Sequence, residues 1–250
     1  MSFYSFARGR IPVMWPRGIV EFVRGAADLI FPNACLLCDA PQAGAELFRH
    51  GFCSKCRHVV TADPAERCPK CAATVGPHTD LSGGCPACRK RGFVFDTAVR
   101  LSVYEGVLRA GILRTKGSGG EPVAEMLGRT FAEVRSAELR ALNTTVVVPV
   151  PLHWRRRWTR GYNQAGAIAR EIASAVGVSV RPDWVVRTRP TEQHTQPSAS
   201  AREENVRGVF RVGRHASFAG SAVLVVDDVM TTGSTVAEVA RVVRAAGASR

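Results

Sequence analysis

The sequence predicts an α/β fold in which a mainly parallel, doubly wound sheet follows a small cysteine-rich module. Three observations lead to this prediction. All eight cysteines fall between positions 35 and 88, in four Cys-x-x-Cys pairs. From position 93 onward, strand-like and helix-like segments alternate, which is typical of a parallel sheet with helices on both faces. A short apolar run near the end of the chain leads into an acidic, hydroxyl-rich turn.

Length and composition are those of a globular chain with one large domain and a small module. The 250 residues are 46% hydrophobic and 22% charged. No run approaches the roughly 18 to 20 apolar residues that a membrane-spanning helix needs, and the arginine- and proline-containing N-terminus lacks the pattern of a secretory signal. We therefore expect a cytoplasmic protein without a membrane span. The net charge of +13 favours polyanionic partners, although a general bias toward arginine would give the same surplus.

The cysteine pairs have the spacing of zinc ligands. A two-residue spacer lets both thiolates of a tight turn reach one tetrahedral ion, and a second such turn completes the shell. A disulfide framework is disfavoured because nothing marks the chain as secreted. We predict two structural zinc ions, held by Cys35, Cys38, Cys53, Cys56, Cys68, Cys71, Cys85 and Cys88. The first pair can join either the second pair in a sequential arrangement or the third pair in a cross-braced one.

The remainder of the chain alternates between the two kinds of secondary structure. Strand-like apolar runs cover 93–104, 146–150 and 222–226, and helical apolar spacing covers 121–142, 165–177 and 236–247. Ligands of such sheets bind at the carboxyl ends of the strands. An α/β unit usually returns through one more strand after a helix such as the last one. We therefore expect either a longer chain or a sheet without that edge strand.

The strongest chemical signal follows the run at 222–226. Asp227 and Asp228 end that strand, and their carboxylates suit sugar hydroxyls or Mg²⁺. The next turn offers backbone amides, hydroxyls and the positive end of a helix dipole, which together form a phosphate cradle. Its members are Thr231, Thr232, Gly233, Ser234 and Thr235. We expect Thr235 and Glu238 to form a capping box. The structural alternative is an acidic pair that merely ends a strand and caps a helix.

Residues 223–235 resemble the phosphoribosyl-pyrophosphate (PRPP) motif of type I phosphoribosyltransferases, in which the acidic pair holds the ribose hydroxyls and the loop holds the 5′-phosphate. The chain from about Phe31 onward is similar to the ComF/GntX family, which joins a zinc-binding module to such a domain. The resemblance is carried by Phe31-Pro32, Tyr104-Glu105-Gly106, Lys116, 148–152, 160–164 and 202–210. We therefore expect an N-terminal arm or short helix over 1–32, a double zinc-ribbon module over 33–92, and a phosphoribosyltransferase-like domain over 93–250.

The resemblance also implies roles for basic residues. The pyrophosphate would lie against Lys116, Arg157, Arg160 and Arg202. The segment 153–160 interleaves arginines with two tryptophans, a combination that suits single-stranded nucleic acid, because rings stack on bases while arginines follow the phosphates. The candidate residues for this contact are Trp154, Arg155, Arg156 and Trp158. A solvated loop with one tryptophan in the core is the alternative. Residues 188–208 show no regular period and suit a lid over the ligand.

These features predict an enzyme that binds PRPP with Mg²⁺ and transfers ribosyl-5-phosphate to an unidentified acceptor, with Asp227 and Asp228 as its central residues. The ComF resemblance implies a part in DNA uptake during natural competence, together with other competence proteins. The alternative is a non-catalytic, single-stranded DNA-binding competence factor that uses the same fold as a scaffold.

Overall fold

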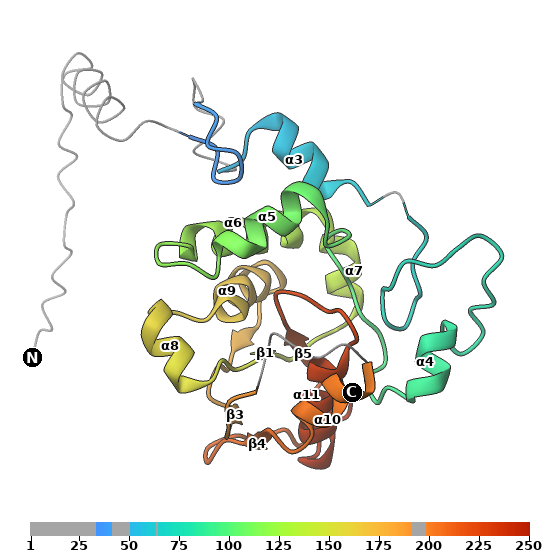
Figure 1. Ribbon diagram of the computed structural model, residues 1–250. Helices are drawn as coiled ribbons and strands as arrows, with labels where there is room; N and C mark the ends of the chain where they lie inside the picture. The colour runs from blue at the N-terminus through green and yellow to red at the C-terminus, as the bar shows by residue number, and fades with distance from the viewer. Residues whose placement is uncertain (1–33, 42–50, 64, 192–198) are drawn as a thin grey trace, which may run out of the picture.

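The computed structural model describes residues 34–41, 51–63, 65–191 and 199–250 (Figure 1). The expected N-terminal arm over 1–32 lies outside these residues, as does Phe31-Pro32. The helices are α3 (Ser54–Thr61), α4 (Pro86–Arg91), α5 (Gly106–Arg114), α6 (Glu121–Val134), α7 (Ser136–Ala141), α8 (Trp154–Arg160), α9 (Gln164–Val176), α10 (Ala199–Val206) and α11 (Ser234–Ala245). The strands are β1 (Val146–Pro149), β2 (Ser179–Val180), β3 (Val185–Arg187), β4 (Phe210–Val212) and β5 (Val223–Val226). None of the described helices is long and apolar enough to cross a membrane.

A parallel sheet of order β2-β1-β5 forms the centre of the α/β part, and β3 and β4 form a separate antiparallel pair. The central strand β1 is buried along its whole length, as its run of valines predicts. It pairs with β5 from Val146 opposite Val223 to Pro149 opposite Val226. The carboxyl ends of β1 and β5 are therefore level, and the loops that follow them start side by side.

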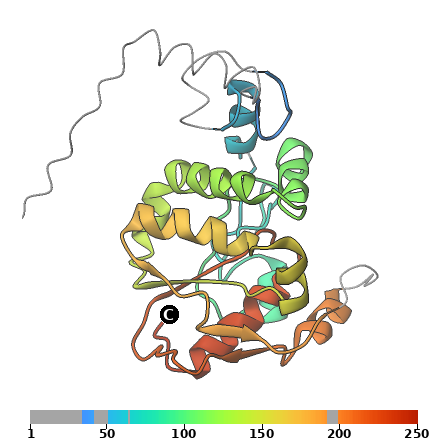
Figure 2. The ribbon, with the colours of Figure 1, turned by 90° about the vertical axis from the view of Figure 1, so that its left-hand side faces the viewer.

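Helices cover both faces of this sheet, which confirms the doubly wound arrangement (Figure 2). Val147 of β1 packs into one core with α6 and α9, whereas Val146 and Val148 pack into a second core with α11 and Phe218. The alternation follows from the two-residue period of a strand. Helices α6 and α9 lie close together at Gly128, where a Cβ would come within 2.8 Å of the Ile168 Cα.

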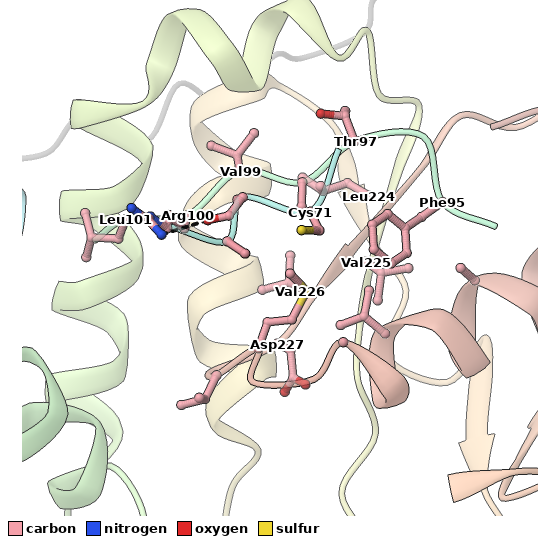
Figure 3. A pocket seen from close by; sticks show the side chains of 18 of the residues that line it. Cys71, Phe95, Thr97, Val99, Arg100, Leu101, Leu224, Val225, Val226 and Asp227 are labelled. Carbon is pink, nitrogen blue, oxygen red and sulfur yellow. Dashed lines mark hydrogen bonds between the residues drawn. The ribbon is translucent and has the colours of Figure 1, made fainter. Parts of the chain in front are cut away.

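One edge of the sheet is open to a cavity. Among the described residues, β5 pairs with β1 on one side only. On its other side lies a cavity of about 670 Å³, lined by β5 and by the segment 93–104 (Figure 3). The expected strand over 93–104 is wrong, because this segment runs past β5 across the cavity without forming a ladder. At the start of β5, the Val223 amide donates to the Arg250 carbonyl (2.8 Å).

Two further expectations about helices are corrected. The helix expected over 121–142 is divided into α6 and α7 at Arg135, whose backbone leaves the helical region. Its guanidinium donates to Asp63 (3.1 Å) and to the Leu101 carbonyl (3.0 Å), so tertiary contacts accompany the break. The segment 188–208 is not irregular throughout, since it contains α10, which packs against α11.

Candidate functional site

The eight cysteines form two clusters of four. Cys35, Cys38, Cys53 and Cys56 make the first cluster, and Cys68, Cys71, Cys85 and Cys88 make the second. The sulfur atoms within each cluster all lie within 4.8 Å of one another. The first Cys-x-x-Cys pair therefore joins the second pair, and the third joins the fourth. This is the sequential arrangement of the two that the sequence left open.

The geometry of both clusters fits a zinc ion. In the second cluster, the Sγ atoms of Cys68 and Cys88 are 3.8 Å apart, and those of Cys71 and Cys85 are 3.7 Å apart. In the first cluster, Cys38 and Cys53 are 3.8 Å apart. A tetrahedron with Zn–S bonds of about 2.3 Å has edges of about 3.8 Å. Four thiolates leave no open coordination position, so the sites suit structural rather than catalytic metal.

The same backbone pattern is built twice around these clusters. The amide of Cys35 donates to the Ala40 carbonyl, and the amide of Cys68 donates to the Ala73 carbonyl in the same way. The Cys53 amide donates to the Cys35 sulfur (3.3 Å), as the Cys85 amide does to the Cys68 sulfur (3.2 Å). Such donors stabilise a thiolate. Burial alone would raise the pKa of Cys68, but the amides of Cys71 and Cys85 outweigh it and lower this pKa to about 6.

The acidic turn lies where the sheet predicts it, at the carboxyl end of β5. Strand β5 ends at Val226, and α11 begins at Ser234, with Gly233 as its N-cap residue in the left-handed conformation (φ 75°). The hydroxyls of Thr232 and Ser234 lie 2.9 Å apart within the turn. Residues 231–235 thus place several backbone amides and hydroxyls around the N-terminus of a 12-residue helix, an arrangement that binds anions.

Two carboxylates and a lysine stand at the entrance to this turn. Asp227 is half-buried, and its carboxylate accepts from the Asp228 amide (2.9 Å). Desolvation, followed by the negative charge of Asp228, raises the pKa of Asp227 well above its usual value. The Nζ of Lys116 lies 3.9 Å from Asp228. Lys116 therefore approaches the acidic pair from the loop between α5 and α6.

Tyr162 fixes the loop that carries Lys116. Its hydroxyl donates to the Thr115 carbonyl, one residue before Lys116. A Cβ at Gly120 would come within 2.9 Å of that hydroxyl, so the loop folds tightly over the tyrosine. Burial, followed by the negative charge of Glu121, raises the pKa of Tyr162 to about 12, and the positive charge of Arg160 acts in the opposite direction.

The remaining basic candidates lie on two helices. The segment expected as a turn or loop at 153–160 contains α8, on which Arg157 is exposed and Arg160 is half-buried. Arg202 is exposed on α10, which packs against α11, the helix that follows the turn 231–235. The side chain of Arg156 lies outside the described residues. Both tryptophans of α8 are on the surface, Trp154 with 59% and Trp158 with 87% of its area exposed.

The Arg155 guanidinium lies over the Trp154 ring, 5.3 Å from its centroid. The alternative of a solvated loop with one tryptophan in the core is therefore wrong. Helix α8 presents both rings and neighbouring arginines to solvent.

The expected capping box is also wrong. Glu238 does not cap α11; its carboxylate accepts from the Gly208 amide (2.8 Å) and pairs with Arg241 (2.7 Å). It therefore ties the end of α10 to α11. Sequence reasoning also missed Arg187 at the end of β3, whose positive charge acts on the pKa of Asp227. The sequence signal for this residue is its position at the end of the short apolar run that forms β3.

Arg91 was missed as well. This residue belongs to α4 in the second cysteine unit, and its guanidinium donates to the Thr232 carbonyl in the turn 231–235. Phe93 packs beside Gly233 in the same turn. No local motif marks these contacts, because Arg91 and Thr232 are 141 positions apart in the chain.

Residues 125–250 match the family model described as the phosphoribosyl transferase domain. The chain belongs to this family. It is also similar over most of its length to DNA utilization protein YhgH of Escherichia coli K12, with 32% identity over 233 residues, 88% of this chain and 95% of that protein. The Salmonella typhi protein of the same name is 30% identical over 224 residues, with the same coverage. Competence protein F of Haemophilus influenzae is 27% identical over 221 residues, 87% of this chain and 93% of the relative.

The resemblance to the ComF/GntX family is thereby confirmed. The chain is a phosphoribosyltransferase-domain protein of the DNA utilization and competence family, with two four-cysteine clusters ahead of that domain. The acidic turn after β5 lies inside the matched region, and both cysteine clusters precede it in the chain.

Proposed function

We propose that this protein binds PRPP with Mg²⁺ and transfers its ribosyl-5-phosphate to an acceptor in the handling of DNA. One observation carries the proposal: the acidic pair and the amide-rich turn follow β5 directly, with Lys116 3.9 Å from Asp228. A phosphate, a sugar with two hydroxyls and a second anionic group would each meet a suitable partner there. The names of the relatives support the link to DNA.

In this proposal, the amides and hydroxyls of 231–235 hold the 5′-phosphate, and Asp227 and Asp228 accept from the ribose hydroxyls. Lys116 and Arg160 lie on the side of the pyrophosphate, with Arg157 and Arg202 as further candidates. Bound Mg²⁺ would supply charge neutralisation on the pyrophosphate. The acidic pair offers the oxygen ligands that this ion prefers.

The reaction needs no nucleophilic side chain. The bond between C1′ and the pyrophosphate oxygen breaks, the leaving pyrophosphate takes the electron pair, and the acceptor forms the new bond to C1′. Positive charge develops on the ribose ring while negative charge develops on the leaving group. The residues of the site therefore act by positioning the two reactants and by stabilising the leaving pyrophosphate.

The proposal also includes two structural zinc ions, one in each cysteine cluster. The sulfur spacing supports this occupant, and the second cluster lies against the phosphate-binding turn. In this proposal, residues 33–92 form the zinc-ribbon module and residues 93–250 form the catalytic domain.

Calorimetric titration with PRPP and Mg²⁺ tests the site. We expect wild-type protein to bind, and the double variant Asp227→Asn with Asp228→Asn to lose at least a hundredfold in affinity, since two charge-assisted contacts disappear. Asp183→Asn, which removes an exposed carboxylate elsewhere, serves as the control and should bind as wild type does. Unchanged affinity in the double variant would exclude this site.

A second candidate function is single-stranded DNA binding by α8. The observation that favours it is the pair of exposed rings on one basic helix, Trp154 at 59% and Trp158 at 87% exposure. Exposed tryptophans beside arginines offer bases a stacking surface and phosphates a cation. The two functions are compatible if the transferase acts on or near DNA.

Fluorescence anisotropy with a labelled single strand tests this second function. Stacking contributes about 1–3 kcal/mol per base, so Trp154→Ala with Trp158→Ala should weaken binding by at least about tenfold. Leu113→Ala, at a residue that is 43% exposed on α5, is the matched control. Binding should also weaken as salt rises. Affinity that ignores both the tryptophans and the salt would exclude α8 as the contact.

A further inference from the structure

A short connection joins the second cysteine cluster to the phosphate-binding turn. Cys88 lies on α4, and the helix ends three residues later at Arg91. Gly92 caps it in the left-handed conformation (φ 58°), which turns the chain toward Phe93. A metal ligand, a cation and an aromatic ring therefore follow one another within six residues, with little freedom between them.

Arg91 contacts a backbone carbonyl of the turn. In an anion-binding turn, the amides point toward the anion and the carbonyls must point away from it. The Arg91 guanidinium donates to the Thr232 carbonyl, which fixes the direction of that carbonyl. The same guanidinium lies 5.9 Å from the centroid of the Phe93 ring. The charge therefore has a fixed position.

Phe93 supports the next residue of the turn. A Cβ at Gly233 would lie 3.1 Å from the Phe93 Cζ and 3.3 Å from its Cε1, so the ring lies directly against the glycine backbone. Phe93 belongs to the buried cluster of the four cysteines, on which Met230 and Ala237 also pack. The turn thus rests on the second cysteine unit from both its ends.

The first cysteine unit lies elsewhere. It packs on α5 and α6 through Leu37, Leu108 and Ile112, and it meets the chain after β5 at Val229. Figure 1 places α3 of the first unit above α5 and α6, and α4 of the second unit on the side of α11.

We propose that Arg91 is a positioning residue for the phosphate-binding turn, and that the second cysteine unit is thereby an integral part of the 5′-phosphate site. This proposal rests on the proposed function for its ligand. Loss of Arg91 frees the Thr232 carbonyl to rotate toward the anion, where it opposes binding. The effect is confined to the 5′-phosphate, because the proposed pyrophosphate side consists of Lys116, Arg157 and Arg160 of α8 and Arg202 of α10, none of which forms a hydrogen bond or ion pair with Arg91 among the described residues.

The test compares three variants of the full chain, Arg91→Ala, Arg91→Lys and Lys90→Ala. Lys90 is exposed on the same helix and carries the same charge, so its loss controls for net charge. Calorimetry measures ribose 5-phosphate and magnesium pyrophosphate separately. Arg91→Ala should weaken ribose 5-phosphate binding roughly tenfold or more and leave pyrophosphate within about twofold. Arg91→Lys should restore part of the loss, and Lys90→Ala should match wild type for both ligands.

Hydrogen exchange of the ligand-free protein gives an independent readout. The amides of 232–235 should exchange faster in Arg91→Ala than in Lys90→Ala, while both variants keep two equivalents of zinc. Equal exchange in these two variants would overturn the positioning role. Equal loss of both ligands in Arg91→Ala would overturn it as well. Failure of wild-type protein to bind PRPP and ribose 5-phosphate would instead overturn the proposed function, and the exchange rates would still decide the role of Arg91.

Discussion

Replacement of Gly233 by alanine tests whether the turn 231–235, the proposed phosphate site, depends on its backbone conformation and on Phe93. Gly233 has a φ of +75°, a region that costs an L-residue about 1–2 kcal/mol. The new Cβ would also lie 3.1 Å from the Phe93 ring, closer than ordinary van der Waals contact. Crowding of this kind costs about 1–3 kcal/mol more when the ring cannot withdraw. We therefore expect Gly233→Ala to lower the free energy of unfolding by about 2–5 kcal/mol.

Gly220 offers a matched control. Its φ is +68°, and a Cβ there would meet nothing within 4 Å. Gly220→Ala therefore has the conformational cost without the contact. At about 2–4 °C per kcal/mol for a chain of this size, Gly220→Ala should lower Tm by about 2–8 °C. Gly233→Ala should lower it by roughly twice as much.

Thermal unfolding and calorimetric titration with PRPP together decide the outcome. Gly233→Ala should lose ligand affinity, because the shifted turn no longer aims its amides at the phosphate, whereas Gly220→Ala should bind normally. Adding Phe93→Leu to Gly233→Ala should recover part of the lost stability by making room for the Cβ. The reasoning would be refuted if the two glycine variants had equal Tm values and equal affinities.

Three other outcomes are expected. Folding raises the pKa of Asp227, so the ionised carboxylate lowers the free energy of unfolding at every pH above the unfolded-state pKa. Asp227→Asn should therefore have a higher Tm than wild type at pH 7. This difference in Tm should disappear as the pH falls through about 3.9. The side chain of Asp63 is only 1% exposed and pairs with Arg100 (2.7 Å) and Arg135 (3.1 Å). Asp63→Ala should therefore lower the free energy of unfolding, measured with denaturant, by about 3–5 kcal/mol. Replacement of an exposed acidic residue should leave it unchanged. Dialysis against a strong chelator should release two equivalents of zinc by elemental analysis and lower Tm; a metal-free protein with unchanged Tm would contradict structural metal sites.

The features that the sequence predicts well are local in the chain. A Cys-x-x-Cys pair defines its own turn, and a strand, an acidic pair and a hydroxyl-rich turn follow one another in thirteen residues. Each of these patterns contains most of the atoms that determine its geometry. The valine run of β1 similarly predicts a strand buried on both faces, as it is.

The features that the sequence does not predict depend on distant partners. Arg135 divides a regular helical pattern while its side chain reaches Asp63, 72 positions away. Glu238 has the spacing of a capping residue, yet the Gly208 amide and Arg241 occupy its carboxylate. The segment 93–104 has the apolar residues typical of a strand, yet it forms no ladder, because a cavity separates it from β5. In each case the local sequence favours the predicted structure, but a tertiary contact, or the lack of one, determines the structure that forms.

The repeated hydrogen-bond pattern around Cys35 and Cys68 describes one small architecture used twice in a single chain. The copies differ in the helix that contains their last cysteine. Helix α3 continues five residues past Cys56 to Thr61, whereas α4 stops at Arg91, where Gly92 reverses its direction. The glycine that ends α4 thus lets the second cysteine unit pack at a different place in the molecule from the first. Two units with the same cysteine arrangement can therefore make different contacts when the helices that follow them differ in length.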